Sequence, residues 1–230
     1  MKNEARERAL AVLSGSGERL TEHEAKQLLA CFGVRVTREA IAMSASAASA
    51  CARRIGFPVA LKALSPDLRG KRAAGAVALN VGNAAEVRAA FARVLQHARQ
   101  HDARARLEGV LVSEMVPRGI DVTLRYERKR GRGEITFGLG GLLGIAAGAC
   151  ARRRPPLSRA AARAMVHEVP GIARVLRAHG DPGGLCDLVE RFAGLLRELP
   201  GITAFHMDVH ALPKSQGYAV VDAWADRNDE

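Results

Sequence analysis

The chain has 230 residues, of which 48% are hydrophobic, 26% are charged and only 4% are aromatic, and its formal net charge is +11. No apolar run approaches the roughly 18 to 20 residues of a membrane-spanning helix, and the charged N-terminus lacks the apolar stretch of a signal peptide, so we expect a cytoplasmic protein with no membrane partner. The cysteines are far apart, which excludes a Cys-x-x-Cys zinc site and a small disulfide framework.

Helices and strands should alternate in the first half of the chain. Helix starts are signalled by a Thr-x-x-Glu capping box at Thr21, by Ser44 or Ser46, and by an Asn-x-x-Glu box at Asn83. In order, we predict a helix at 21–33, a strand at 34–41, a helix ending at Gly56, a strand around Lys62, a strand at 76–81, a helix from 83 and a strand at 109–116.

Pro117 ends that last strand, because a proline interrupts a hydrogen-bonded ladder, and we expect a hinge there. The prediction is therefore an N-terminal extension at 1–19, a first lobe at 20–117 and a second lobe at 118–230. Beyond the hinge we predict strands at 121–127 and 134–137, an irregular stretch to Pro156, helices at 158–167, 172–178 and 185–199, and strands at 203–210 and 218–224.

Two short segments carry the first functional signal. Lys62 lies in an apolar run that stops at Ser-Pro-Asp, and a lysine in such a run needs an anionic partner to offset its desolvation. The segment FGLGG at 137–141 follows a strand, and its missing side chains would let backbone N–H groups approach an anion. Together the segments predict a nucleotide phosphate held between two parts of the protein.

The positive charge comes mainly from arginine and is densest at 125–132, which we interpret as an exposed hairpin tip. Such a charge balance suits nucleotides and coenzyme A as well as nucleic acid. The low aromatic content removes the stacking platforms of single-strand binders and disfavours nucleic acid. His97 and His101 are one helical turn apart, but a solvated helix face explains them better than a metal site.

Five segments in this order resemble the ATP-grasp (beta) subunit of ADP-forming acyl-CoA synthetases, which is also the ATP-grasp domain of related protein acetyltransferases. They are GFPVALK at 56–62, SPD at 65–67, EGVLV with EMV at 108–116, FGLGG at 137–141 and VDA at 221–223. The resemblance runs from about Leu20 to Trp224. It implies an α+β ATP-grasp fold, in which two α+β lobes clamp a nucleotide.

The resemblance also implies site residues. The lysine at position 62 would contact ATP phosphates, and the strand end at 114–116 would hold adenine through its backbone. The residues expected to bind the nucleotide are Lys62, Glu114, Met115, Val116, Asp121, Gly138, Gly140, Gly141 and Arg153.

The chain departs from the family pattern at its catalytic positions. Gly70 replaces the family's phosphate-relay histidine, and glycine cannot accept a phosphoryl group, so no catalytic residue is assigned. Ile145 stands where the family has a glutamate, and 147–149 replace its Leu-Lys-Asp.

The metal region has changed as well. Where the family reads Glu-x-Asp-x-Asn-Pro, this chain has His206, Asp208 and His210, which should share one face of a strand, with Asp222 on the next strand. Three interpretations remain open. The histidines pair with neighbouring acids and the metal function is lost, they form a manganese or zinc site with the aspartates, or Asp208 and Asp222 retain weak magnesium binding.

The sequence thus predicts an ATP-binding subunit of the acyl-CoA synthetase type, with altered catalysis and a separate coenzyme A-binding alpha-type partner. The alternatives are a non-catalytic nucleotide-sensing or scaffold module and, less favoured, a basic nucleic-acid-binding protein. The acyl substrate, the choice between ATP and GTP, and the oligomeric state stay open.

Overall fold

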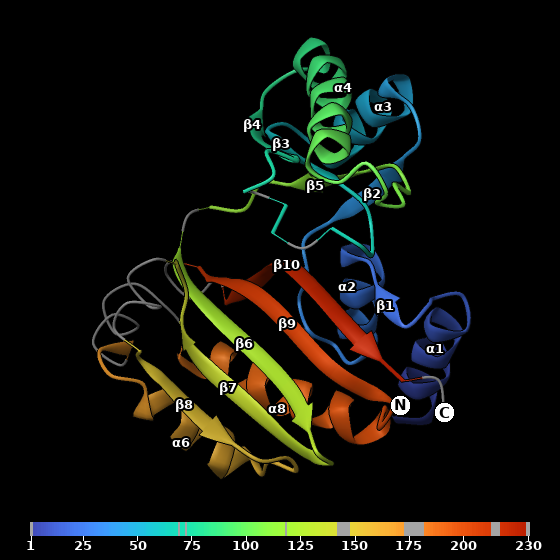
Figure 1. The fold of residues 1–230 in the computed structure, drawn as a ribbon. Helices are drawn as coiled ribbons and strands as arrows, with labels where there is room; N and C mark the ends of the chain where they lie inside the picture. The colour runs from blue at the N-terminus through green and yellow to red at the C-terminus, as the bar shows by residue number, and fades with distance from the viewer. Residues whose placement is uncertain are drawn as a thin grey trace. The chain divides into compact units, whose positions relative to one another are not determined.

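The computed structural model describes residues 2–68, 70–71, 73–117, 119–141, 148–172, 182–212 and 217–228. Two compact units form, and each is an antiparallel sheet with helices packed on it (Figure 1). The first unit consists of Met1–Leu20, Glu24–Val36 and Pro117–Glu230, and the second of Thr21–His23 and Thr37–Val116. The fold is α+β, as predicted.

Within the described residues, the first unit holds a six-stranded sheet in the order β1-β10-β9-β6-β7-β8. Its hairpin between β6 and β7 turns at Arg130 and Gly131, which both have positive φ, so the basic segment does form a hairpin tip. The elements are α1 (Lys2–Ser14), β1 (Arg19–Leu20), α2 (Glu22–Cys31), β6 (Ile120–Lys129), β7 (Arg132–Leu139), β8 (Cys150–Arg153), α6 (Arg159–Glu168), α8 (Pro182–Glu198), β9 (Ile202–Ala211) and β10 (Tyr218–Arg227).

The alternation of buried and half-buried residues along β9 shows how the core of this unit forms. Phe205, Met207 and Val209 are buried, while the residues between them are only half-buried. Helices α6 and α8 cover the apolar face of the sheet (Figure 1), and Phe192 of α8 meets Phe205 edge-to-face with ring centroids 5.3 Å apart. The other face of β9 is therefore left for polar side chains.

The second unit is a four-stranded sheet in the order β2-β5-β3-β4, counted over the residues that the structure describes. Helices α3 and α4 pack on one face, where Val59 and Leu61 of β3 and Val112 of β5 join the core. The elements are β2 (Glu39–Ala42), α3 (Ala45–Ile55), β3 (Val59–Ala63), β4 (Val77–Val81), α4 (Ala84–His101) and β5 (Val110–Glu114).

The helix ends follow local sequence signals. Side-chain oxygens of Ser44, Asn83 and Ser158 each accept the backbone N–H three residues further on, at 3.0 to 3.1 Å, and so cap α3, α4 and α6. After α2 and α3 the chain turns at Gly33 and Gly56, with φ of +74° and +102°. The capping predictions for Ser44 and Asn83 are confirmed.

Some elements differ from the sequence-based prediction. Strand β8 was predicted to be irregular, but its residues pair with β7, with Ala151 opposite Phe137. The strand predicted at 34–41 begins only at Glu39, and Val36 makes an isolated parallel bridge to Val220. The predicted helix at 172–178 lies almost entirely outside the described residues. Among the helices that are described, none has both the length and the apolar character that a membrane span needs.

The compact units also differ from the predicted lobes. One boundary between the units falls between Val116 and Pro117, but 1–20 and 24–36 group with the C-terminal half, and the hinge itself stays a prediction. The reason is pairing over long sequence separations, since β1 pairs with β10 and Leu28 and Leu29 join the core of the first unit. Such pairings are not encoded in local periodicity.

Candidate functional site

Lys62 lies on β3, an interior strand between β5 and β4. Its neighbours Leu61 and Ala63 belong to the core with α3 and α4, so alternation along the strand directs Lys62 to the opposite face of the sheet. Only 10% of its side chain is exposed. Lys62 is therefore neither on an edge strand of the described sheet nor directed into solvent.

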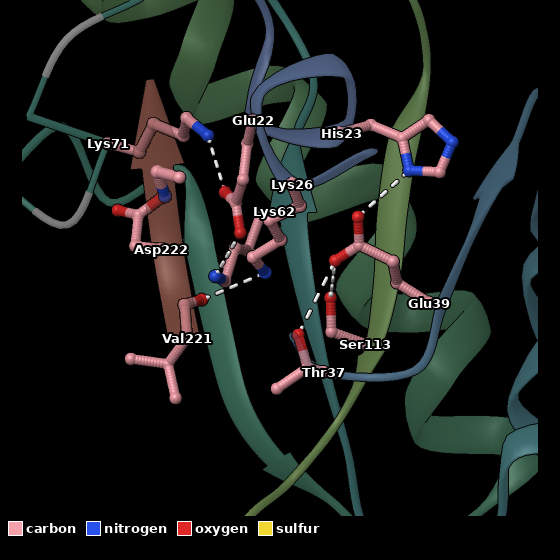
Figure 2. Close-up of polar contacts among 11 residues, drawn as sticks. Glu22, His23, Lys26, Thr37, Glu39, Lys62, Lys71, Ser113, Val221 and Asp222 are labelled. Atoms are coloured by element: carbon pink, nitrogen blue, oxygen red, sulfur yellow. Dashed lines mark hydrogen bonds and ion pairs between the residues drawn. The ribbon is translucent and has the colours of Figure 1, made fainter. Parts of the chain in front are cut away.

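A carboxylate from within the chain meets Lys62. Glu22 opens α2, its side chain is fully buried, and its Oε1 accepts a hydrogen bond from Lys62 Nζ at 2.5 Å (Figure 2). A carboxylate in the first turn of a helix is also stabilised by the N–H groups of that turn. The prediction that buried Lys62 needs an anionic partner is confirmed, and Glu22 is a partner that the sequence did not reveal.

Lys71 reaches the same carboxylate from a hydrogen-bonded turn. Its Nζ donates to Glu22 Oε2 at 2.7 Å, and its side chain is also only 10% exposed. The carbonyl of Lys71 accepts the N–H of Ala76 at 2.9 Å, and the carbonyl of Ala76 accepts the N–H of Ala63 at 3.0 Å. The turn is thereby tied to β3 one residue beyond Lys62.

A second buried acid, Glu39, organises the same face of the sheet. Its Oε1 lies 2.8 Å from Nδ1 of His23, and its Oε2 accepts hydrogen bonds from Ser113 Oγ at 3.3 Å and Thr37 Oγ1 at 3.5 Å (Figure 2). His23 directly follows Glu22 in the first turn of α2. Glu39 therefore fixes this turn against strands β2 and β5.

The predicted adenine segment is the end of β5 and the residues after it. The N–H of Glu114 donates to the carbonyl of Arg38 at 2.9 Å, and the Glu114 carboxylate accepts from Arg38 Nε at 2.7 Å. The N–H of Met115 donates to the carbonyl of Pro58 at 3.4 Å. Both N–H groups serve the unit's own backbone, so a purine would use other main-chain groups of this segment.

The polar face of β9 brings together the residues predicted for a metal. His206, Asp208 and His210 share that face, as predicted. His206 Nε2 lies 3.2 Å from Asp208 Oδ1, and its ring stacks on Trp224 with centroids 5.6 Å apart. His210 Nε2 lies 3.2 Å from Oδ1 of Asp121, directly opposite on β6. Each histidine is thus paired with an acid.

A β-bulge places Asp222 on this polar face. Between Val220 and Asp222 the pairing of β10 with β9 shifts by one residue, so that Asp222 rather than Val221 stands opposite Asp208. Without the shift, alternation would turn Asp222 toward the core. The buried ammonium of Lys26 donates to the carbonyl of Val221 at 3.1 Å and so supports the bulge (Figure 2).

In the described residues, no group of three or more His, Cys, Asp or Glu side chains is arranged to hold a metal ion. Each of the two histidines contacts an acid, and a transition-metal site that contains both of them stays a prediction. Asp208 and Asp222 remain opposite each other on neighbouring strands. Magnesium commonly takes one or two protein carboxylates together with phosphate oxygens, so these two aspartates fit magnesium better than zinc.

The ATP-grasp domain family matches residues 11–224, nearly the whole chain. The chain belongs to the ATP-grasp family. The resemblance inferred from the five sequence segments and the ATP-grasp fold that it implied are both confirmed.

This ATP-grasp domain is similar to ADP-forming acetate–CoA ligases. It is 33% identical over 228 residues to ADP-forming acetate–CoA ligase I of Archaeoglobus fulgidus, which covers 96% of this chain but 33% of that protein. It is 31% identical over 188 residues to the beta subunit of the corresponding ligase of Pyrococcus furiosus, with 80% and 81% covered. The solved dinucleotide-forming acetyl-coenzyme A synthetase 1 of Ca. Korarchaeum cryptofilum, in complex with coenzyme A, Ca-AMPCP and HgCl+, has a TM-score of 0.89 at 30% identity, with 97% and 100% covered. The chain thus spans a third of the A. fulgidus ligase and most of the P. furiosus beta subunit.

The glycine-rich segment of this ATP-grasp domain begins inside β7, where Gly138 lies, and continues beyond the strand at Gly140 and Gly141. Its glycines allow close backbone packing. A Cβ on Gly138 would lie 2.7 Å from the carbonyl oxygen of Ala149, and one on Gly140 would lie 3.1 Å from the carbonyl carbon of Asp121. The N–H of Gly140 donates to the Asp121 carbonyl at 2.7 Å, while Gly141 has a φ of +69°. Phosphate contacts by these glycines stay a prediction, and the bond to Asp121 already engages the amide of Gly140.

Two other side chains singled out in the sequence have structural partners. Arg153 pairs with Glu168 at the end of α6, so this guanidinium already has an anionic partner within the chain. His97 Nδ1 lies 3.0 Å from the carbonyl of Gly75 and holds the turn that carries Lys71.

Sequence reasoning missed Glu22, Glu39 and Lys71. Glu22 lies inside the Thr21 capping box, a pattern that predicts the start of a helix and gives no sign of a buried ion pair. Lys71 directly follows Gly70, and no local pattern marks it as a partner of a buried acid. A buried acid that serves a lysine 40 residues away has no local signal.

Proposed function

We propose that this ATP-grasp domain binds ATP and that Lys62 contacts the phosphates. The observation that carries the proposal is the convergence of two ammonium groups, from Lys62 and Lys71, on one buried carboxylate. Ammonium groups held at fixed positions suit the several charges of a triphosphate. The K. cryptofilum relative is in complex with the nucleotide analogue AMPCP, which supports the same ligand class here.

Adenine would be held by the segment at 114–116. Because the N–H groups of Glu114 and Met115 have backbone partners, we assign the carbonyl of Glu114 and the N–H of Val116 to the purine edge. In an extended segment these two groups point to the same side, which matches the adjacent donor and acceptor of adenine.

Asp208 and Asp222 are the residues that would hold a magnesium ion with the nucleotide. When bound, such an ion neutralises phosphate charge. His206 Nε2 and His210 Nε2 face carboxylate oxygens of Asp208 and Asp121 at 3.2 Å, so neither nitrogen is assigned to the ion.

The reaction class that we propose is that of ADP-forming acyl-CoA synthetases, in which acyl-CoA, ADP and phosphate are interconverted with the acid, ATP and coenzyme A. Two findings support it: the P. furiosus relative is a beta subunit, and the K. cryptofilum structure contains coenzyme A. Since this chain spans a third of the A. fulgidus ligase, a coenzyme A-binding alpha-type partner would complete the reaction.

Catalysis is proposed to be impaired at the phosphoryl relay. Gly70, at the position of the family's relay histidine, has no atom that could carry a phosphoryl group. It has a φ of +67°, and an added Cβ would meet no atom within 4 Å. A Cβ at this position would therefore meet no clash, and histidine tolerates this left-handed backbone better than most residues.

The same Gly70 favours a second candidate, a module that binds nucleotide without turnover. The test combines the purified chain with the alpha subunit of the P. furiosus ligase, ATP, coenzyme A and acetate. We expect ATP to raise the melting temperature of the unaltered chain while little ADP forms, and ADP formation to rise in Gly70→His.

The control is Gly131→His, since Gly131 has a φ of +75° and the same open surroundings on the β6–β7 hairpin. No ATP-induced stabilisation of the unaltered chain would contradict nucleotide binding. Stabilisation without turnover in either protein would favour the non-catalytic module.

A further inference from the structure

We propose that Lys71 is a second phosphate-binding residue and that Glu22 is the positioning residue that holds Lys62 and Lys71 together. The inference rests on the proposed ATP binding and extends it from one lysine to a lysine pair. It assigns to the turn that carries Lys71 a direct role in binding the triphosphate.

The two ammonium groups lie close together because they use the two oxygens of one carboxylate. Lys62 Nζ is 2.5 Å from Glu22 Oε1 and Lys71 Nζ is 2.7 Å from Oε2, so the two nitrogens are separated by no more than about 7 Å. Figure 2 shows both lysines directed at Glu22 from different segments. One phosphate group, or two adjacent ones, can contact both nitrogens at this separation.

The position of Lys71 is set by its backbone and not by a long flexible loop. Its carbonyl accepts the N–H of Ala76, and the carbonyl of Gly70 accepts the N–H groups of Ala73 and Ala74 at 2.9 and 3.3 Å. His97 of α4 contacts the same turn at the carbonyl of Gly75. A cation presented from such a turn loses little conformational entropy when it binds an anion.

Glu22 cannot readily leave its place between the lysines. Its side chain has no solvent-exposed surface, and it belongs to the first turn of α2. The next residue, His23, contacts the buried Glu39 at 2.8 Å, which anchors that turn to β2. A carboxylate fixed in this way determines where both ammonium groups lie.

An ammonium group can serve a carboxylate and a phosphate at the same time. It has three N–H donors, and a bond to an ionised acceptor is stronger than a bond between neutral groups. We therefore infer that Glu22 stays in place when the nucleotide binds and that the phosphates meet the lysine pair beside it. Glu22 would thus hold the two ammonium groups in place before the nucleotide binds.

The experiment measures the affinity of the full chain for ATP and for AMP by calorimetry. Lys71→Met keeps the apolar stem and removes the charge, and we expect its ATP affinity to fall by about ten- to a hundredfold with a much smaller loss for AMP. Lys71→Arg, which keeps the charge, should recover most of the loss. The matched control is Lys129→Met, because Lys129 is an exposed lysine paired with Glu127 on the hairpin of the first unit.

The positioning role of Glu22 is tested by the same comparison of ATP affinity with AMP affinity. Glu22→Gln should weaken ATP binding about tenfold, and its effect should be smaller in the Lys71→Met background than in the unaltered chain, since Glu22 would then position Lys62 alone. A melting curve without nucleotide accompanies each variant, so that loss of fold is separated from loss of phosphate recognition.

The outcomes separate the two claims. If Lys62→Met abolishes ATP binding but Lys71→Met and Lys129→Met retain the same ratio of ATP to AMP affinity as the unaltered chain, the lysine pair is wrong and the proposed function stands. A lowered melting temperature of Lys71→Met with an unchanged ratio also overturns the pair. If the unaltered chain binds no ATP, both the function and the pair are overturned.

Discussion

The lysine group of the second unit, which consists of Lys62, Lys71 and Glu22, keeps its charged side chains buried. The acidic face of the first unit, which carries Asp121 and Asp208, leaves its charged side chains partly exposed to water. Lys62 and Lys71 are almost inaccessible to water and share the buried carboxylate of Glu22. Asp121 and Asp208 are about half exposed, and each meets one histidine at 3.2 Å. Burial demands a partner of opposite charge, whereas an exposed acid can exchange its partner for water or a cation at little cost.

The difference predicts which region tolerates change. Charges of the lysine group depend on one another, so that a substitution there should affect both folding and binding. Charges on the face of β9 are screened by solvent, and substitutions there should affect mainly the ligand that the face binds.

The largest effect is expected from Glu22→Ala. Removing the carboxylate leaves two nearly buried ammonium groups without it, and we expect the free energy of unfolding to fall by about 3 to 5 kcal/mol. Urea unfolding followed by circular dichroism measures the change. Glu134→Ala, at a half-exposed acid on β7, should change it by less than about 0.5 kcal/mol. Equal effects of the two substitutions would remove the contrast between the regions.

Lys62→Met should have the second-largest effect. The substitution keeps the stem packed on β3 and leaves Glu22 paired with Lys71, so the fold should survive, but ATP affinity should fall by about a hundredfold or more. Calorimetric titration with ATP provides the measurement. Retained ATP binding in a folded Lys62→Met protein would show that the phosphates bind elsewhere.

Asp222→Asn should have a smaller and conditional effect. We expect ATP binding to weaken about tenfold with magnesium present and to change little without it, because the substitution removes a charge that only the ion would use. Asp187→Asn on α8 is the control, since Asp187 is also half exposed. A loss of the same size with and without magnesium would contradict a metal role for Asp222.

The smallest effect concerns Cys31, at the end of α2. Burial raises the pKa of its thiol above the ordinary value, so less thiolate is present near pH 7.5 and alkylation should be several-fold slower than for glutathione. The labelling rate should rise as the pH passes through the raised pKa. Labelling by iodoacetamide at several pH values, followed by peptide mass spectrometry, checks this. A rate equal to that of glutathione would show that the thiol is not shielded.

Most secondary structure could be predicted because its signals are local. The caps at Ser44 and Asn83, the glycine stop after α2 and the alternation of β9 depend on residues a few positions apart. Strand β8 could not be predicted, since its residues are extended only because they pair with β7. The β-bulge before Asp222 could not be predicted either, because its register is defined by the partner strand.

For the candidate site, the sequence alone determined the family and the shared face of His206, Asp208 and His210, because residue identity and spacing encode them. It also singled out Lys62 as the candidate phosphate-binding lysine and Gly70 as the position where the resemblance implies a relay histidine. Only the tertiary structure decided that Glu22 and Lys71 join Lys62, and that His206 and His210 lie beside Asp208 and Asp121. The physical reason is that electrostatic partners are chosen by proximity in space, and proximity between segments distant in sequence arises only when the sheets and helices pack.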